Sequence, residues 1–130
     1  MGLDNGINIE RNDKSMSIYD TIKRFEQNYD HDHKYNFEVA YWRKCWNVRN
    51  MILRLLPAGE SEWKFPITRE DIPEIIDALK SLNAETWDEG MSIWSWDEQE
   101  SLIEQYIENL EYLYELMGEH DLDVYFYDSY

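Results

Sequence analysis

The fold is decided by residues 95–117, which read SWDEQESLIEQYIENLEYLYELM. Ser95 and Glu98 have the spacing of a capping box, in which each side chain accepts a hydrogen bond from the other residue's backbone N–H. Gly118, which follows the stretch, is a residue type that commonly ends helices. We therefore predict one long amphipathic helix, whose apolar stripe follows helical spacing and consists of Ile103, Tyr106, Ile107, Leu110, Leu113, Tyr114 and Met117.

Strand-forming residues lie near both ends of the chain. Residues 124–127 are β-branched or aromatic, which predicts a strand. Asn5-Gly6 is a favoured tight-turn pair, and the alternation of Ile7 and Ile9 with polar residues predicts a short strand after that turn. We expect the C-terminal strand to pair with another strand, with the N-terminal one as its partner.

Helix caps and breakers define the elements between these strands. Three further helices are predicted over residues 17–25, 36–56 and 68–82, because Ser17, Asn36 and Thr68 are residue types that cap helices. An edge strand is predicted over residues 63–67, where Pro66 lacks a backbone donor. Residues 84–94 are predicted to form a loop that carries tryptophans.

Length and composition bound the fold class. A chain of 130 residues is the size of one domain, and 43% apolar residues with 20 aromatic side chains suffice for a core. No repeat, low-complexity tract or long linker divides the sequence. We predict a single α+β domain over residues 1–130, with about four helices packed on a small, mainly antiparallel sheet.

The net charge of −16 excludes several classes of protein. Binding to nucleic acid through phosphate neutralisation needs basic surfaces, so we expect no direct nucleic-acid partner. One cysteine cannot form an internal disulfide, and neither a signal segment nor a long apolar run is present. A cytoplasmic protein without membrane association is the expectation.

The negative charge is concentrated in the last 50 residues, which hold 14 acidic residues and no Lys or Arg. Four of these carboxylates lie on one face of the predicted helix over 95–117 and are called the acidic ridge: Glu104, Glu108, Glu111 and Glu115. One interpretation is a solvated face that favours solubility. The other is a surface that binds a basic partner and imitates the charge row of a nucleic-acid backbone.

Arg49 has an unusual place on the predicted helix over residues 36–56. It projects from the middle of the apolar arc, between the directions of Trp42 and Cys45, where an unpaired charge would be costly. A structural interpretation pairs it with an acidic residue or lets it reach water. A functional interpretation makes it a phosphate or carboxylate ligand beside tryptophan faces. The ligand-binding residues that the functional interpretation predicts are Trp42, Arg43, Lys44, Trp46, Arg49, Trp94 and Trp96.

Other residue patterns predict neither a catalytic site nor a cofactor. His31-Asp32-His33 has ligand types suited to divalent metals, but no third ligand is identifiable, so no metal site is predicted. Cys45 is expected to be a buried, inert thiol. Phosphate-binding glycine loops, nucleophile elbows and Cys-x-x-Cys pairs do not occur in the sequence. A small enzyme that uses carboxylates is kept as a third alternative.

Three stretches resemble a family of small uncharacterised proteins of bacteriophages, prophages and bacterial genomes. They are MGLD at residues 1–4, EVAYWRK at residues 38–44 and YFYDSY at residues 125–130. The chain departs from the family pattern after Lys44, where it has Trp46 and Arg49 in place of a polar Asn or His. The resemblance implies a context in which small phage proteins disarm host defences by capturing a nucleotide signal or blocking a protein.

These observations together predict a non-catalytic intracellular binding protein, encoded by a phage and counter-defensive, that acts in the host cytoplasm. Its expected ligand is an anionic, nucleotide-like signal molecule held in a pocket of tryptophan and arginine side chains. The alternative is an acidic inhibitor that blocks a basic, nucleic-acid-binding site on a host defence protein. Whether the chain forms a homo-oligomer is left open.

Overall fold

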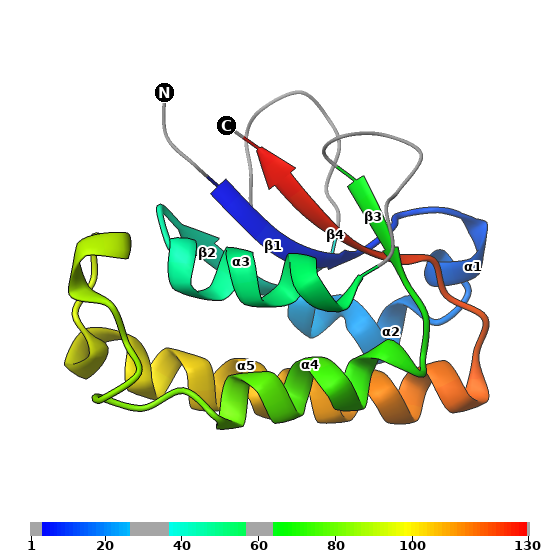
Figure 1. Cartoon of the computed structure of the whole chain (residues 1–130). Helices are drawn as coiled ribbons and strands as arrows, with labels where there is room; N and C mark the ends of the chain where they lie inside the picture. The colour runs from blue at the N-terminus through cyan, green and yellow to red at the C-terminus, as the bar shows by residue number, and fades with distance from the viewer. Residues whose placement is uncertain (1–3, 27–36, 57–63, 130) are drawn as a thin grey trace.

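The computed structural model describes residues 4–26, 37–56 and 64–129. Its strands are β1 (Asp4–Ile9), β2 (Phe37–Arg43), β3 (Lys64–Ile67) and β4 (Val124–Ser129). They form one antiparallel sheet in the order β2-β1-β4-β3, so the first and last strands of the sequence are the two central ones (Figure 1). The predicted α+β class and the predicted pairing of the C-terminal strand with the N-terminal one are confirmed.

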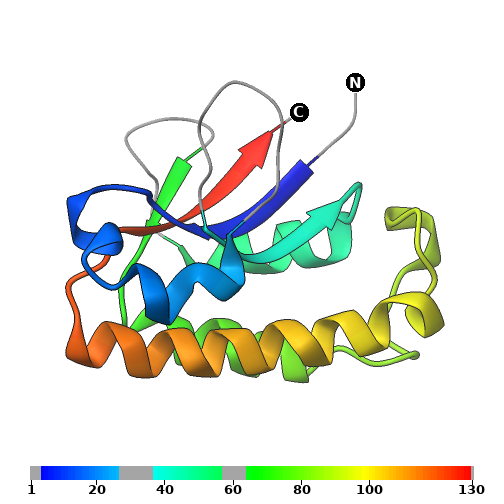
Figure 2. The same cartoon turned by 180° about the vertical axis from the view of Figure 1, so that it is seen from behind.

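The helices pack on one face of this sheet. They are α1 (Asp13–Met16), α2 (Tyr19–Ile22), η1 (Lys23–Phe25), α3 (Trp46–Leu55), α4 (Asp71–Lys80), η2 (Glu89–Met91) and α5 (Trp96–Glu119). Figures 1 and 2 show α4 and α5 side by side as the layer farthest from the sheet, with α3 between this layer and the strands. None of the described helices has both the length and the apolar character needed to span a membrane.

The long C-terminal helix begins where the sequence predicts. Ser95 Oγ accepts from the Glu98 backbone N–H at 3.3 Å, and Glu98 Oε2 accepts from the Ser95 N–H at 3.1 Å, which confirms the capping box. Ile103, Leu110 and Leu113 of the predicted stripe are buried in the core. Helix α5 continues through Gly118 and ends at Glu119, two residues beyond the predicted end.

Asn5 and Gly6 do not form a turn, which makes that prediction wrong. Both lie within β1, where Gly6 is opposite Tyr41 on β2 and Tyr127 on β4. A Cβ atom on Gly6 would lie 2.5 Å from the Ala40 carbonyl oxygen and 2.9 Å from Tyr127 Cε1. Glycine is needed here because neighbouring groups approach the backbone closely, not because the chain reverses direction.

The predicted helix over residues 36–56 is wrong in its first half. Residues 37–43 form β2, Lys44 adopts a positive φ of 48°, and helix α3 begins only at Trp46. The β-branched and aromatic residues within 37–43 suit a strand, and six residues of this segment pair with β1. Pairing with a distant strand therefore outweighs the local helical periodicity. The proposed cap Asn36 lies outside the described residues.

The remaining predictions are confirmed in part. The segment 17–25 is not one helix but the short elements α2 and η1, preceded by α1 with its own cap at Asn12. Strand β3 lies within the predicted range 63–67, and α4 lies within the predicted range 68–82. The backbone N–H and hydroxyl of Thr68 both donate to the Asp71 carboxylate, at 2.9 and 3.0 Å.

Candidate functional site

A pocket of about 350 Å³ lies between the edge strand β2 and the first half of α5. It brings together three of the predicted ligand-binding residues, Trp42, Arg43 and Trp94, although Trp94 is about 50 residues from the other two in sequence. The full lining consists of Tyr41, Trp42, Arg43, Trp94, Glu98, Gln99, Leu102 and Tyr106.

Specific contacts hold the walls of this pocket in place. Asn109 Nδ2 of α5 donates to the Val39 carbonyl at 3.0 Å, which fixes the helix along the edge of β2. The loop before α5 is attached to the connection between β2 and α3, because the Ile93 N–H donates to the Lys44 carbonyl at 3.3 Å. These contacts explain why a tryptophan from that loop reaches the pocket.

Two polar side-chain atoms beneath the pocket wall find no hydrogen-bond partner among the described residues. They are the Trp42 indole nitrogen Nε1, a donor, and the Gln99 carbonyl oxygen Oε1, an acceptor. Trp42 is 2% exposed and Gln99 is 4% exposed. Leaving such a group unpaired costs about 1–3 kcal/mol, so unpaired buried groups are rare in folded proteins. The other such atoms among the described residues belong to Asn5 and Asn8 of β1, outside the pocket lining.

The rim of the pocket combines aromatic, apolar and positively charged groups. Trp94 is 42% exposed, and Leu102 beside it is exposed as well. The Tyr106 ring packs edge-on against Trp42 with 5.1 Å between the ring centroids. Arg43 is exposed and makes no ion pair within the part of the chain that the structure describes. Glu98 is already engaged in the capping box at Ser95.

Arg49 is committed to an ion pair. Its Nε lies 2.8 and 2.9 Å from the two oxygens of Asp128 on β4, and its second terminal nitrogen lies 2.7 Å from Asp128 Oδ2. The guanidinium also lies 4.9 Å from the centroid of a Trp46 ring. The side chains of Arg49 and Asp128 are 14% and 2% exposed. This is the arrangement that the structural interpretation of Arg49 describes, and Arg49 does not line the pocket.

Three other predicted residues also lie outside the pocket lining. Lys44 occupies the connection between β2 and α3, Trp46 stacks with Arg49, and Trp96 packs against Trp87 with 5.6 Å between ring centroids. Sequence reasoning missed Gln99 as a site residue. A signal was available, because Gln99 stands four residues before Ile103 and so falls on the apolar stripe of the helix.

The acidic ridge is exposed along α5. None of its four carboxylates makes an ion pair with a described Lys or Arg, so the ridge presents uncompensated negative charge to solvent.

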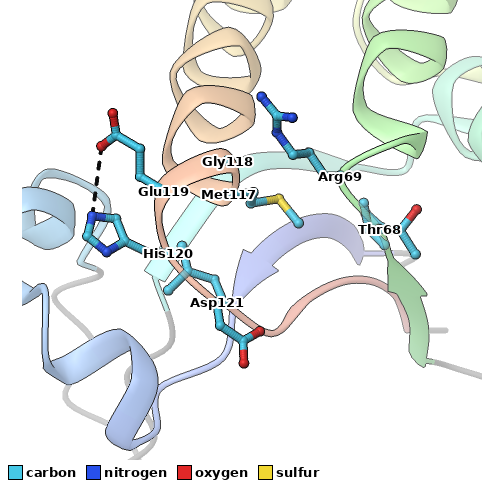
Figure 3. A pocket seen from close by; sticks show the side chains of 9 residues that line it. Thr68, Arg69, Met117, Gly118, Glu119, His120 and Asp121 are labelled. Carbon is cyan, nitrogen blue, oxygen red and sulfur yellow. Dashed lines mark ion pairs between the residues drawn. The ribbon is translucent and has the colours of Figure 1, made fainter.

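A larger pocket of about 560 Å³ lies where α5 ends, between Met117 to Leu122 and the segment from Ile67 to Arg69 (Figure 3). Arg69 Nε donates to the Tyr114 carbonyl at 3.0 Å, and its guanidinium lies 3.9 Å from the Tyr114 ring centroid. Arg69 therefore lines the pocket while its guanidinium is held against Tyr114 in the last part of α5. None of the buried polar atoms that lack a partner in the described residues belongs to this lining.

The described residues contain no group of three or more His, Cys, Asp or Glu that could hold a metal ion. His31-Asp32-His33 lies outside them. Cys45 is buried as predicted, burial raises the pKa of its thiol, and the Ser92 hydroxyl donates to its sulfur at 3.4 Å.

Comparison with protein-family models, with curated proteins and with solved structures finds no match to this chain. The class of protein must therefore be argued from the pocket itself.

Proposed function

We propose that this chain is a binding protein that captures a flat, anionic, nucleotide-like small molecule in the pocket between β2 and α5. The observation that carries the proposal is that two residues lining one pocket, Trp42 and Gln99, have the buried atoms Nε1 and Oε1, which lack partners among the described residues. The edge of a nucleobase offers an acceptor and a donor, which are the complementary groups. A modest shift of the wall on binding brings these atoms into contact with the ligand, and pairing them removes their unfavourable free energy.

Residues at the rim of the pocket provide the contacts for the flat face and the phosphate of the ligand. The exposed Trp94 ring provides a surface on which a base stacks. Arg43, which has no carboxylate partner in the described residues, provides the cation for a phosphate. The volume of about 350 Å³ lies within the range of small-molecule pockets, roughly 300–1,000 Å³.

The proposed activity is capture rather than catalysis. Glu98 is the one carboxylate among the described lining residues. It accepts a hydrogen bond from the Ser95 backbone and stabilises the start of α5, so it is not arranged as a general base. The resemblance to phage proteins extends the proposal to the sequestration of a nucleotide signal used in host defence.

Calorimetry with mononucleotides, cyclic dinucleotides and the matching nucleosides tests this proposal. Trp94→Ala should weaken binding of every member by about 1–3 kcal/mol, the contribution of one stacked base. Arg43→Gln should weaken binding of the phosphorylated members and leave the nucleosides unchanged. Arg54→Gln is the matched control, because Arg54 is an exposed arginine on α3 outside the pocket. Absence of binding to all members would reject the proposal.

A second candidate function rests on the acidic ridge. Its four exposed carboxylates, without cationic partners in the described part of the chain, favour binding to a basic site on another protein. Such an association should be fast at low ionic strength and should weaken steeply as salt is added, because exposed charges are screened. Capture in the pocket should depend less on salt.

A further inference from the structure

The face of the sheet opposite the helices carries a second polar cluster. The register places Asn8 of β1 directly opposite Glu38 of β2 and directly opposite Tyr125 of β4. Side chains directly opposite each other on antiparallel strands have Cβ atoms about 4.5–5.5 Å apart. We call these three residues the Asn8 row. Asn8 alternates along β1 with the fully buried Ile7 and Ile9, so the row lies on the other face of the sheet from these core residues. Figures 1 and 2 show α3, α4 and α5 on one side of the strands.

Among the described residues, the Asn8 row has a buried amide oxygen without a donor and a carboxylate without a cation. Asn8 is 8% exposed, its Nδ2 donates to the Tyr125 hydroxyl at 3.5 Å, and its Oδ1 is buried without a partner in the described residues. Glu38 is half-buried, and no described Lys or Arg pairs with it. In its neutral form Glu38 can donate its proton to an acceptor such as Asn8 Oδ1, whereas its charged form leaves two acceptors together without a donor.

On the same face of the sheet, the ammonium group of Lys64 is bound by a tyrosine ring and a carboxylate. Lys64 Nζ lies 4.4 Å from the centroid of the Tyr125 ring and 3.2 Å from Glu10 Oε1. A tyrosine ring and a carboxylate thus bind one primary ammonium of the chain itself. On the other side of Asn8, Glu38 supplies a carboxylate that no described Lys or Arg pairs with.

We propose that the Asn8 row is a binding site for a primary ammonium group, carried either by a small amine or by a lysine side chain. The ammonium would donate to the Glu38 carboxylate, which pairs with no described Lys or Arg, and to Asn8 Oδ1, which is buried without a partner among the described residues. The net charge of −16 favours the approach of a cation. The site shares no residue with the pocket lining, although Glu38 interacts electrostatically with Tyr106 of that lining.

Glu38 makes this binding depend on pH. Burial raises the pKa of Glu38 to about 7. Of its neighbours, Tyr106 on α5 has a pKa raised by burial and, secondarily, by the charge of Glu38, so it stays neutral near pH 7. Within the row, Glu38 lies opposite the uncharged Asn8 on β1, and Tyr125 follows on β4. Glu26, which forms a β-bridge with Phe37 beside Glu38, pairs with Arg11 at 3.3 Å.

The ammonium binds the charged carboxylate. The affinity of the site for the amine is therefore highest above pH 7 and falls as the pH drops through the pKa of Glu38. With a pKa of about 7, the charged fraction changes roughly tenfold between pH 8 and pH 6. Binding at pH 7 should release roughly half a proton per amine.

Isothermal titration of the full chain with 1,4-diaminobutane and with Nα-acetyl-lysine methylamide tests the site. Both should bind at pH 8 and bind roughly tenfold more weakly at pH 6. Binding of the diamine alone would assign the site to free amines, and binding of both would include lysine side chains. Glu38→Gln should abolish binding. Glu10→Gln is the control, since it removes a carboxylate of the same face that is already paired with Lys64.

Three results would overturn the proposal. They are no binding of either amine at pH 8, amine binding by the Glu38→Gln variant that equals that of the wild type, or a loss of amine binding in Glu10→Gln as large as that in Glu38→Gln. Proton release, measured with the wild type in two buffers of different ionisation enthalpy, needs no variant, and its absence at pH 7 would also count against the site. Trp94→Ala should leave amine binding unchanged, which separates this site from the nucleotide pocket.

Discussion

Replacing Arg49 by Ala should destabilise the protein by about 3–5 kcal/mol. The Asp128 side chain is 2% exposed and accepts three contacts from the guanidinium at 2.7–2.9 Å. Without Arg49 this carboxylate would lose the cation that it pairs with among the described residues. The cost therefore exceeds that of losing an exposed ion pair, which is at most about 1 kcal/mol.

Urea denaturation with linear extrapolation measures this change. For a chain of this size, about 4 °C of melting temperature corresponds to 1 kcal/mol, so the expected loss is roughly 12–20 °C. Arg54→Ala on the exposed side of the same helix should stay within about 0.5 kcal/mol of the wild type.

A double variant separates the ion pair from the rest of the Arg49 side chain. Arg49→Met with Asp128→Leu should recover much of the lost stability, because an apolar pair commonly replaces a buried ion pair at little cost. A loss below about 1 kcal/mol for Arg49→Ala would refute this reasoning and would show that Asp128 finds another partner or becomes protonated at little cost.

Four further outcomes are expected. Changing all four acidic ridge residues to Gln should leave the melting temperature equal or slightly higher, because like charges at helical spacing repel; a loss of activity in a cell-based defence assay would favour the second candidate function. Gly6→Ala should cost about 1–3 kcal/mol in urea denaturation, because its Cβ would press on Ala40 and Tyr127. Deleting residues 122–130 removes a central strand, so circular dichroism should show no cooperative thermal transition. Folding raises the pKa of Glu38, so the folded state binds more protons and loses stability as pH rises from about 4.5 to about 7. Glu38→Gln should therefore raise the melting temperature at pH 8 and change it little near pH 4.5.

Local signals in the sequence predict an element correctly where residues close together in the sequence determine its structure. The capping box at Ser95 and the stripe from Ile103 onward predict α5 because both depend on residues three or four positions apart. The strand at Val124 is predicted by its residue types alone.

Local signals failed where a distant strand competes. Residues 37–43 have the spacing of a helix when viewed alone, but they pair with β1. That error placed Trp42 and Arg49 on one helix, whereas they come from β2 and α3. The sequence therefore predicts only part of the candidate site. Trp42, Arg43 and Trp94 are predicted and line the same pocket, but predicting Gln99 would require knowing which face of α5 covers β2.

The central position of β1 and β4 determines when the sheet can form during synthesis of the chain. Asp4 pairs with Ser129, so the middle of the sheet joins residues separated by nearly the whole chain. During synthesis β1 leaves the ribosome long before β4 exists, and its central edge has no partner in that interval. Contacts of such high sequence separation slow folding, because closing a long loop costs entropy before any contact compensates. The sheet can therefore be completed only after residue 129 has emerged, and until then the open edge of β1 can pair with other chains.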